Sequence, residues 1–167
     1  DVVGADLLLE HDVLAGLGCT EVVTLLNSGN AVFKSKARSG SGCAKAIAPA
    51  LADRFGFDVP VVVKSMPELS AIVAGNPLRF TASDHSRLLV AFVQEAAHLA
   101  SLRGLDSLVV SPEQFTVGSH GAYLLCAAGL LESKAGAALL GKAGQAATTR
   151  NWATVLKLHA LALSVGA

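Results

Sequence analysis

Two segments with the same pattern, residues 22–33 and 115–126, most restrict the fold of this chain of 167 residues. In each segment, an apolar run with β-branched or aromatic residues is joined to a second apolar run by a short polar stretch. The polar stretches, residues 27–30 and 118–121, are rich in glycine, asparagine and serine, which are typical of tight turns. Each segment therefore predicts a β-hairpin, and two hairpins are incompatible with a helical bundle or an all-parallel sheet.

The sequence around the two hairpins also repeats. Helical patterns precede and follow each hairpin, over residues 7–17, 43–55, 95–103 and 131–142. An apolar run over residues 87–94 predicts a strand that opens the second half. By analogy the first half should open with a strand as well, and we expect that strand to lie upstream of Asp1.

The resulting order of strand, helix, hairpin, helix and strand is ferredoxin-like. The β-branched run over residues 57–64 predicts the last strand of the first half. Because Pro60 cannot donate a hydrogen bond, we expect this strand to lie at a sheet edge or to be bulged at Pro60. We therefore predict an α+β fold in which two ferredoxin-like halves pack together. Residues 1–77 form the first half, with its opening strand missing or truncated, and residues 78–167 form the second.

The last helical pattern begins at the only tryptophan, Trp152, and is apolar around most of its circumference. On a 3.6-residue period one face carries Trp152, Val155, Leu156, His159 and Leu163. A helix of this kind is buried against more than one partner. We expect it to lie between two layers or subdomains, with Trp152 largely buried, and to replace or follow the last strand of the second half.

Four polar residues precede this helix, Thr148, Thr149, Arg150 and Asn151, and we interpret this segment as a turn. Two interpretations apply to them. Thr149 or Asn151 caps the helix by accepting hydrogen bonds from its first N–H groups. Alternatively, those N–H groups and Arg150 bind an anion. We favour the cap, because every buried helix needs one and few helices bind ligands.

Composition excludes several classes of protein. Thirteen basic residues balance thirteen acidic ones, so no strong binding to nucleic acid is expected. The cysteines, at positions 19, 43 and 126, lack zinc spacing, so we predict buried reduced thiols in a cytoplasmic protein, with no metal site and no cofactor. The longest uncharged apolar run, near residues 122–131, is too short to span a membrane.

Several segments together carry a resemblance to a known family. They are Ser28-Gly29-Asn30, residues 55–63, residues 74–77 and Thr148-Thr149-Arg150-Asn151-Trp152, the last followed by Thr154, Val155, Lys157 and Leu158. With these segments the chain resembles the bacterial domain-of-unknown-function family 1697. The resemblance implies a two-part α+β fold with ferredoxin-like halves, and no assigned activity. A Gly-Ile-Gly-Arg-Ser-Lys-like segment of that family reads Gly-Leu-Leu-Glu-Ser-Lys here, with Glu132 in place of a base.

These features favour a binding module for a small anionic or nucleotide-like ligand in a cleft between the halves. The candidate ligand-binding residues are Ser28, Asn30, Lys134, Thr148, Thr149, Arg150 and Asn151. One alternative is an enzyme that uses the same cleft, for which the sequence indicates no catalytic residues. The other is an interaction protein without a small-molecule site. We expect a monomer or weak dimer with no membrane partner.

Overall fold

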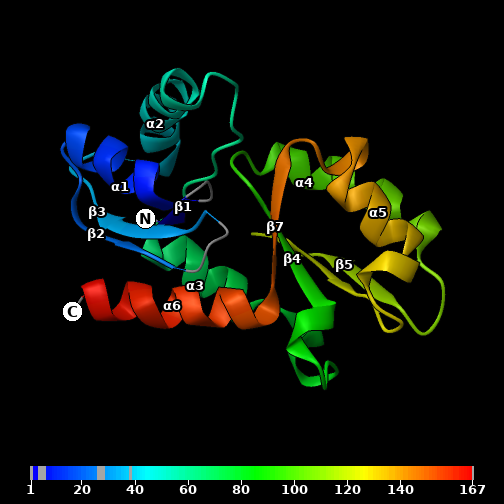
Figure 1. The fold of residues 1–167 in the computed structure, drawn as a ribbon. Helices are drawn as coiled ribbons and strands as arrows, with labels where there is room; N and C mark the ends of the chain where they lie inside the picture. Colours follow the sequence, from blue (N-terminus) through cyan, green and yellow to red (C-terminus); the bar gives the residue numbers. More distant parts are fainter. Residues whose placement is uncertain (1, 4–6, 26–28, 38, 167) are drawn as a thin grey trace. The chain divides into compact units, whose positions relative to one another are not determined.

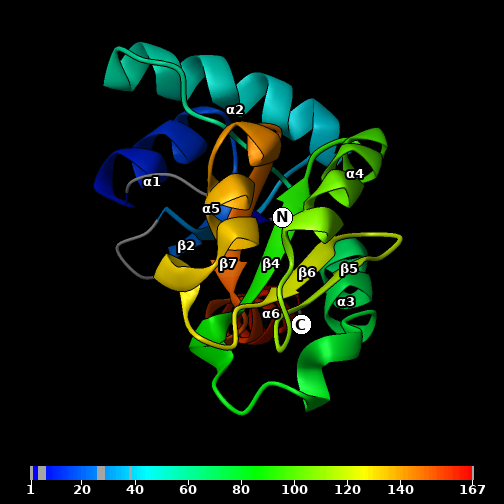
Figure 2. The ribbon, with the colours of Figure 1, turned by 90° about the vertical axis from the view of Figure 1, so that its right-hand side faces the viewer.

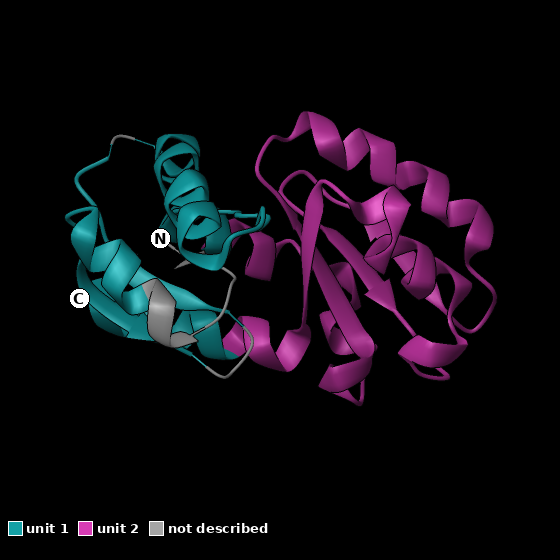
Figure 3. Ribbon diagram, turned by 45° about the horizontal axis from the view of Figure 1, so that its top comes forward, with its two compact units in different colours: residues 1–69, 157–167 teal, residues 70–156 magenta. Residues whose placement is uncertain are grey.

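The computed structural model describes residues 2–3, 7–25, 29–37 and 39–166. The chain forms two compact units, which Figure 3 shows in different colours. Unit 1 comprises residues 1–69 and 157–167, and unit 2 comprises residues 70–156. Each unit contains helices and an antiparallel sheet, so the fold is α+β. The predicted division at residues 77 and 78 stays a prediction.

The sheet of unit 1 contains β1 (Val2–Val3), β2 (Thr20–Thr24) and β3 (Ala31–Lys34), in the order β1-β3-β2 (Figure 1). Both pairings are antiparallel, which confirms the first predicted hairpin as β2–β3. A strand of two residues, β1, opens this unit within the given sequence and pairs with β3. The strand that we expected upstream of Asp1 stays a prediction.

Helices α1 (Leu7–Gly16) and α2 (Gly40–Phe55) contribute to the core of unit 1 together with β3. The buried core consists of Leu14, Ala31, Phe33, Cys43, Ala44, Ile47, Leu51 and Val63. Helix α2 begins where the Ser39 hydroxyl accepts a hydrogen bond from the Gly42 N–H, and it ends at Gly56, whose φ is +77°. A serine cap and a left-handed glycine are the expected signals for the two ends of a helix.

The strand predicted over residues 57–64 does not form, and this prediction was wrong. Lys64 makes an isolated bridge, and residues 57–63 lie outside regular secondary structure, although Val62 and Val63 are buried. Pro60 has no N–H group to donate to a sheet, and the apolar run is packed without forming a strand. Among its described residues unit 1 thus has three strands, and the ferredoxin-like description of the two halves stays a prediction.

Helix α3 (Met66–Ala74) begins with a reciprocal cap. The Ser65 N–H and hydroxyl both donate to Glu68 Oε2, each at 2.8 Å, and the Glu68 N–H donates to Ser65 Oγ at 3.4 Å. Lys64 Nζ lies 3.5 Å from the other carboxylate oxygen. Burial alone would raise the pKa of Glu68, but the hydrogen bonds from Ser65 and the charge of Lys64 outweigh it and lower the pKa.

The sheet of unit 2 contains β4 (Leu88–Val93), β5 (Gln114–Val117), β6 (Ala122–Leu125) and β7 (Ala147–Asn151). Figure 2 shows these strands in the order β5-β6-β4-β7, and every pairing is antiparallel. The second predicted hairpin is confirmed as β5–β6, closed by a hydrogen bond from the Gly118 N–H to the Gly121 carbonyl.

Helices α4 (Ala97–Leu102) and α5 (Lys134–Leu140) pack on one face of this sheet (Figures 1 and 2). All six residues of β4 are buried, as expected for a central strand with apolar residues throughout. Helix α5 begins later than predicted because Ser133 caps it. Short 3₁₀ turns cover Pro77–Phe80, His85–Arg87, Arg103–Leu108, Leu130–Glu132 and Lys142–Gly144.

The last helix, α6 (Trp152–Gly166), buries a stripe of residues three or four apart. Trp152 is 3% exposed, as predicted, and Val155, Leu158 and Ala162 are also buried. Leu163 is 53% exposed, so its predicted place on the buried face was wrong. The buried stripe is rotated away from Leu163, whose side of the helix also carries the exposed Ala160 and Ser164. In the described part of the chain, no helix is long and apolar enough to cross a membrane.

Replacing Trp152 by alanine should lower the free energy of unfolding by about 3–5 kcal/mol, because a large buried side chain is lost. Urea unfolding followed by circular dichroism measures this change without the tryptophan signal. Leu163→Ala, at an exposed position of the same helix, is the control and should stay within about 0.5 kcal/mol of wild type. Equal losses in the two variants would contradict the burial pattern of α6.

Glu68→Gln should make the protein less stable near neutral pH, and the difference should shrink in acid. The lowered pKa of Glu68 means that its carboxylate stabilises the fold above its ordinary pKa of 4.5, and that this contribution is lost as the pH falls through the folded-state value. Urea midpoints measured across this range test the prediction. Glu132→Gln, at an exposed carboxylate of unit 2, controls for loss of charge. A difference that grows in acid would contradict the role of Glu68.

Candidate functional site

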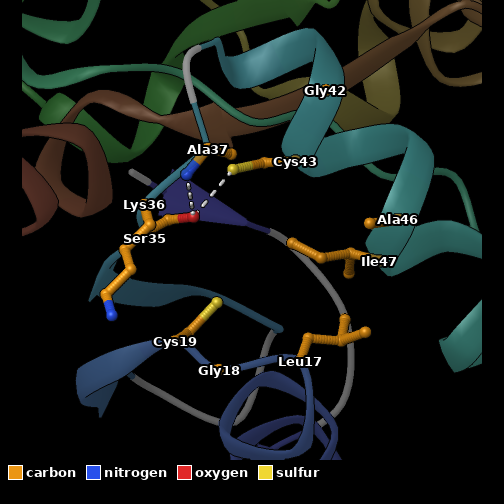
Figure 4. Close-up of a pocket in the computed structure, with 10 residues that line it drawn as sticks. All are labelled: Leu17, Gly18, Cys19, Ser35, Lys36, Ala37, Gly42, Cys43, Ala46 and Ile47. Atoms are coloured by element: carbon orange, nitrogen blue, oxygen red, sulfur yellow. Dashed lines mark hydrogen bonds between the residues drawn. The ribbon is translucent and has the colours of Figure 1, made fainter.

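Unit 1 contains a cavity of about 290 Å³ beside the start of α2. Three segments line it: the end of α1 and the turn into β2, the residues that follow β3, and the first turns of α2 (Figure 4). The lining residues are Leu17, Gly18, Cys19, Ser35, Lys36, Ala37, Gly42, Cys43, Ala46 and Ile47. We call this cavity the α2 pocket.

The turn after α1 fixes the position of Cys19. The Gly18 N–H donates to the Ala15 carbonyl and the Cys19 N–H to the Leu14 carbonyl, each at 3.0 Å. Gly18 has a φ of +79°. This pair of bonds around a left-handed glycine is the Schellman motif, which ends a helix and turns the chain sharply. It places Cys19 directly before β2, on the wall of the α2 pocket.

Ser35 connects the second and third walls of the pocket. Its hydroxyl oxygen accepts a hydrogen bond from the Ala37 N–H at 3.1 Å and from the Cys43 thiol at 3.3 Å (Figure 4). A serine that bonds the backbone two residues further on stabilises a local turn. The same hydroxyl thus shapes the segment before α2 and holds the Cys43 side chain.

The two thiols differ in exposure. Cys43 is buried, whereas Cys19 is partly exposed, so the prediction that all three cysteines are buried was wrong for Cys19. Burial raises the pKa of Cys19, the neighbouring Cys43 raises it further, and the Ser35 hydroxyl opposes the rise. The third thiol, Cys126, is buried in unit 2, and burial raises its pKa as well.

The rest of the lining is apolar on one side and basic at its rim. Leu17, Ala46 and Ile47 supply apolar surface. Lys36 is exposed and is the one charged residue among the described residues that line the pocket. Within the described residues there is no group of three histidine, cysteine or carboxylate side chains that could hold a metal ion. The pocket thus offers a hydroxyl, two thiols, an ammonium group and an apolar wall.

The residues proposed from the sequence as a ligand site are distributed over both units. Ser28 lies outside the described residues. Asn30, in unit 1, is buried, and its side-chain amide donates a hydrogen bond to the Leu25 carbonyl at 3.3 Å. Such a bond stabilises a turn. Lys134 is exposed in the first turn of α5 in unit 2, directly after the cap residue Ser133.

Thr148, Thr149, Arg150 and Asn151 lie on β7, so the interpretation of this segment as a turn was wrong. The segment pairs with β4 in antiparallel register, with Thr149 opposite Ala91. Threonine is common in half-buried strands. The pairing of this segment with the apolar strand β4 cannot be seen in the periodicity of the segment's own sequence. All four residues are half-buried.

A hydrogen bond at the end of this segment confirms that Asn151 caps the last helix. Asn151 Oδ1 accepts a hydrogen bond from the Thr154 N–H at 2.9 Å, so Asn151 caps α6. Arg150 Nη1 donates to the Thr149 carbonyl at 2.8 Å. Thr148 to Asn151 are brought together along one strand. The convergence of this strand with Ser28, Asn30 and Lys134 stays a prediction.

Sequence reasoning did not find the α2 pocket. Its local signals were a serine followed by a lysine before α2, and a cysteine one turn inside the helix. Neither signal shows that Cys19, which belongs to a different segment, lies on the same cavity. Only the packing of α1, β3 and α2 into one core brings Cys19, Ser35 and Cys43 together.

Comparison with known proteins gives a family and a fold. No curated protein matches the chain. A solved structure, that of the conserved bacterial protein SP0830 from Streptococcus pneumoniae, is similar with a TM-score of 0.77 and 19% sequence identity, over 97% of this chain and 97% of that chain. At this identity the likeness shows the fold alone.

The family model described as a protein of unknown function, DUF1697, matches residues 9–123. This match covers more than half of the chain and includes all three segments that line the α2 pocket. It also agrees with the resemblance seen in the sequence. The chain therefore belongs to the DUF1697 family of proteins of unknown function.

Proposed function

We propose that the protein is a binding module and that its α2 pocket takes a small anionic ligand. The observation that carries the proposal is the charge of the pocket. Lys36 stands at its rim, and the described lining includes no carboxylate. An ammonium group on a pocket whose lining carries no carboxylate attracts an anion and repels a cation.

The size of the cavity limits the ligand. Pockets for drug-sized molecules have volumes of about 300–1,000 Å³, and the α2 pocket, at about 290 Å³, lies at the lower end. The volume favours a phosphate or carboxylate compound of a few carbon atoms over a dinucleotide. Leu17 and Ile47 would contact the carbon part, and the Ser35 hydroxyl and Lys36 would contact the anionic group.

The β7 segment is a weaker candidate for the same ligand. Asn151 uses its side-chain oxygen to cap α6, and Arg150 bonds the backbone of its own strand. These hydrogen bonds support the interpretation of Asn151 as a cap. They also engage polar atoms that a ligand would otherwise contact. The proposal therefore keeps the predicted class of ligand and moves its site from Thr148, Thr149, Arg150 and Asn151 to the α2 pocket.

Thermal unfolding of the full chain with inorganic phosphate, glycerol 3-phosphate or butyrate tests the proposal. A ligand at about 100 times its Kd stabilises the native state by about 2.7 kcal/mol, which corresponds to a Tm increase of about 5–10 °C in a chain of this size. We expect this increase with at least one of the three compounds. Lys36→Gln should weaken the binding by about tenfold or more, because a charge-assisted hydrogen bond is lost.

Two variants serve as controls. Lys45→Gln removes an exposed lysine of α2 that does not line the pocket, and it should bind like wild type. Arg150→Ala tests the β7 segment and should also bind like wild type. The absence of a Tm increase with all three compounds would refute anion binding. An increase that survives Lys36→Gln and disappears in Arg150→Ala would place the site on β7.

A further inference from the structure

Unit 2 contains another cavity, of about 270 Å³, which the anion proposal does not use. It lies at the end of the sheet where β4 and β5 begin and β6 ends, beside the loop that precedes β4. We call it the Arg87 pocket. Its polar lining residues are Thr81, Ser83, Asp84, Arg87 and Gln114.

The register of the sheet brings the walls of this pocket together. Gln114 on β5 lies opposite Leu125 on β6, and Leu125 lies opposite Leu88 on β4. The Cys126 N–H donates to the Arg87 carbonyl at 2.9 Å, so β6 is also bonded to the residue directly before β4. Residues that lie opposite each other on paired strands extend from the same face of the sheet. The side chains of Gln114 and Leu125 therefore share one face, and both line the cavity.

Asp84 and Arg87 form a charged pair that is held in place on both sides. Asp84 Oδ1 accepts hydrogen bonds from the Ser86 N–H at 2.9 Å and from the Ser86 hydroxyl at 2.6 Å. These bonds lower the pKa of Asp84, so its carboxylate is charged at neutral pH. Arg87 Nε lies 3.4 Å from Asp84 Oδ2, and Arg87 Nη1 donates to the Ala127 carbonyl at 2.6 Å. Both charged side chains remain about half exposed, so a ligand can reach them.

We propose that the Arg87 pocket binds a small neutral polyhydroxyl compound, namely a monosaccharide or a polyol of similar size. Its described lining contains one acid and one base, so an anion meets the Asp84 carboxylate and a cation meets the Arg87 guanidinium. A hydroxyl group both donates and accepts, so a compound with several hydroxyl groups can donate to Asp84 and accept from Arg87. The α2 pocket differs in this respect, because its lining carries Lys36 and no acid.

The rest of the lining supports this class of ligand. The side chains of Thr81, Ser83 and Gln114 are exposed, and within the described part of the chain none of the three makes a hydrogen bond. Their hydroxyl and amide groups can both donate to and accept from a ligand. Ala82 and Leu125 supply apolar surface for its C–H groups. The volume, about 270 Å³, lies at the lower end of ligand pockets, which span about 300–1,000 Å³, and favours a single sugar ring over an oligosaccharide.

The test is a titration of the labelled full chain with D-glucose, D-ribose or myo-inositol at millimolar concentrations, followed by ¹H–¹⁵N correlation spectra. With at least one of the three we expect saturable shifts of the amide signals of residues 81–87 and 125–127. Arg87→Gln should weaken binding by about tenfold or more, because a charge-assisted hydrogen bond is lost. Gln114→Ala should weaken it by about 2–10-fold, the usual effect of one neutral hydrogen bond. If Arg87→Gln proves unfolded by circular dichroism, Gln114→Ala decides alone.

Gln145→Ala is the matched control, since it removes an exposed glutamine of unit 2 that is not part of the described lining, and it should bind like wild type. An equal loss of binding in Gln145→Ala and Gln114→Ala would overturn the site. So would the absence of saturable shifts with all three compounds, or equal shifts with cyclohexanol, a ring with one hydroxyl group. Shifts with L-alanine and with none of the three compounds would indicate a site for a zwitterion and would also overturn the proposal.

The polyhydroxyl proposal is independent of the anion proposal, because the two pockets lie in different units. Lys36→Gln should lose the phosphate response and keep the response to the polyhydroxyl compounds. Gln114→Ala should show the opposite pattern, with weaker binding of these compounds and an unchanged phosphate response. A loss of both responses in Gln114→Ala would contradict a separate site in unit 2.

Discussion

The turn from α1 into β2 requires a residue with positive φ, and the α2 pocket depends on it. Gly18 meets this requirement with a φ of +79°. A Cβ at this position would meet no other atom within 4 Å, so the constraint is conformational and not steric. For an L-residue the left-handed region costs about 1–2 kcal/mol. Relieving that strain would reorient the turn and move Cys19 away from Ser35 and Cys43.

The second constraint is the Ser35 hydroxyl, which takes part in two kinds of interaction. It accepts a hydrogen bond from the Ala37 N–H, which shapes the segment after β3, and a second one from the thiol of Cys43. The segment before α2 and the side chain inside α2 are therefore positioned by one atom. The walls of the pocket are fixed by backbone geometry and by this hydroxyl, and the side chains that would contact a ligand extend from them.

Local patterns predicted most of the fold. Residues 22–33 and 115–126 form hairpins because turn residues separate two apolar runs. Errors arose where the partner of a segment lies far away in sequence. Residues 57–64 have the composition of a strand but form only an isolated bridge at Lys64, and Thr148 to Asn151 look like a turn but pair with β4.

The candidate site was harder to predict than the fold. Capping by Asn151 follows from local chemistry and was among the predicted interpretations. The α2 pocket needs three segments to meet, and each segment alone has an ordinary explanation: a helix end at Gly18, a serine turn at Ser35, and a core cysteine at Cys43. Such a site becomes visible only after the helices have been packed on the sheet.

The most direct test of the account is a ¹H–¹⁵N correlation spectrum of the labelled protein, recorded during titration with glycerol 3-phosphate. A ligand in the α2 pocket shifts the amide signals of the segments that line it. The account predicts that the largest changes fall on residues 17–19, 35–37 and 42–47, with little change on β7. Changes confined to Thr148 through Asn151, or no changes at all, would contradict it.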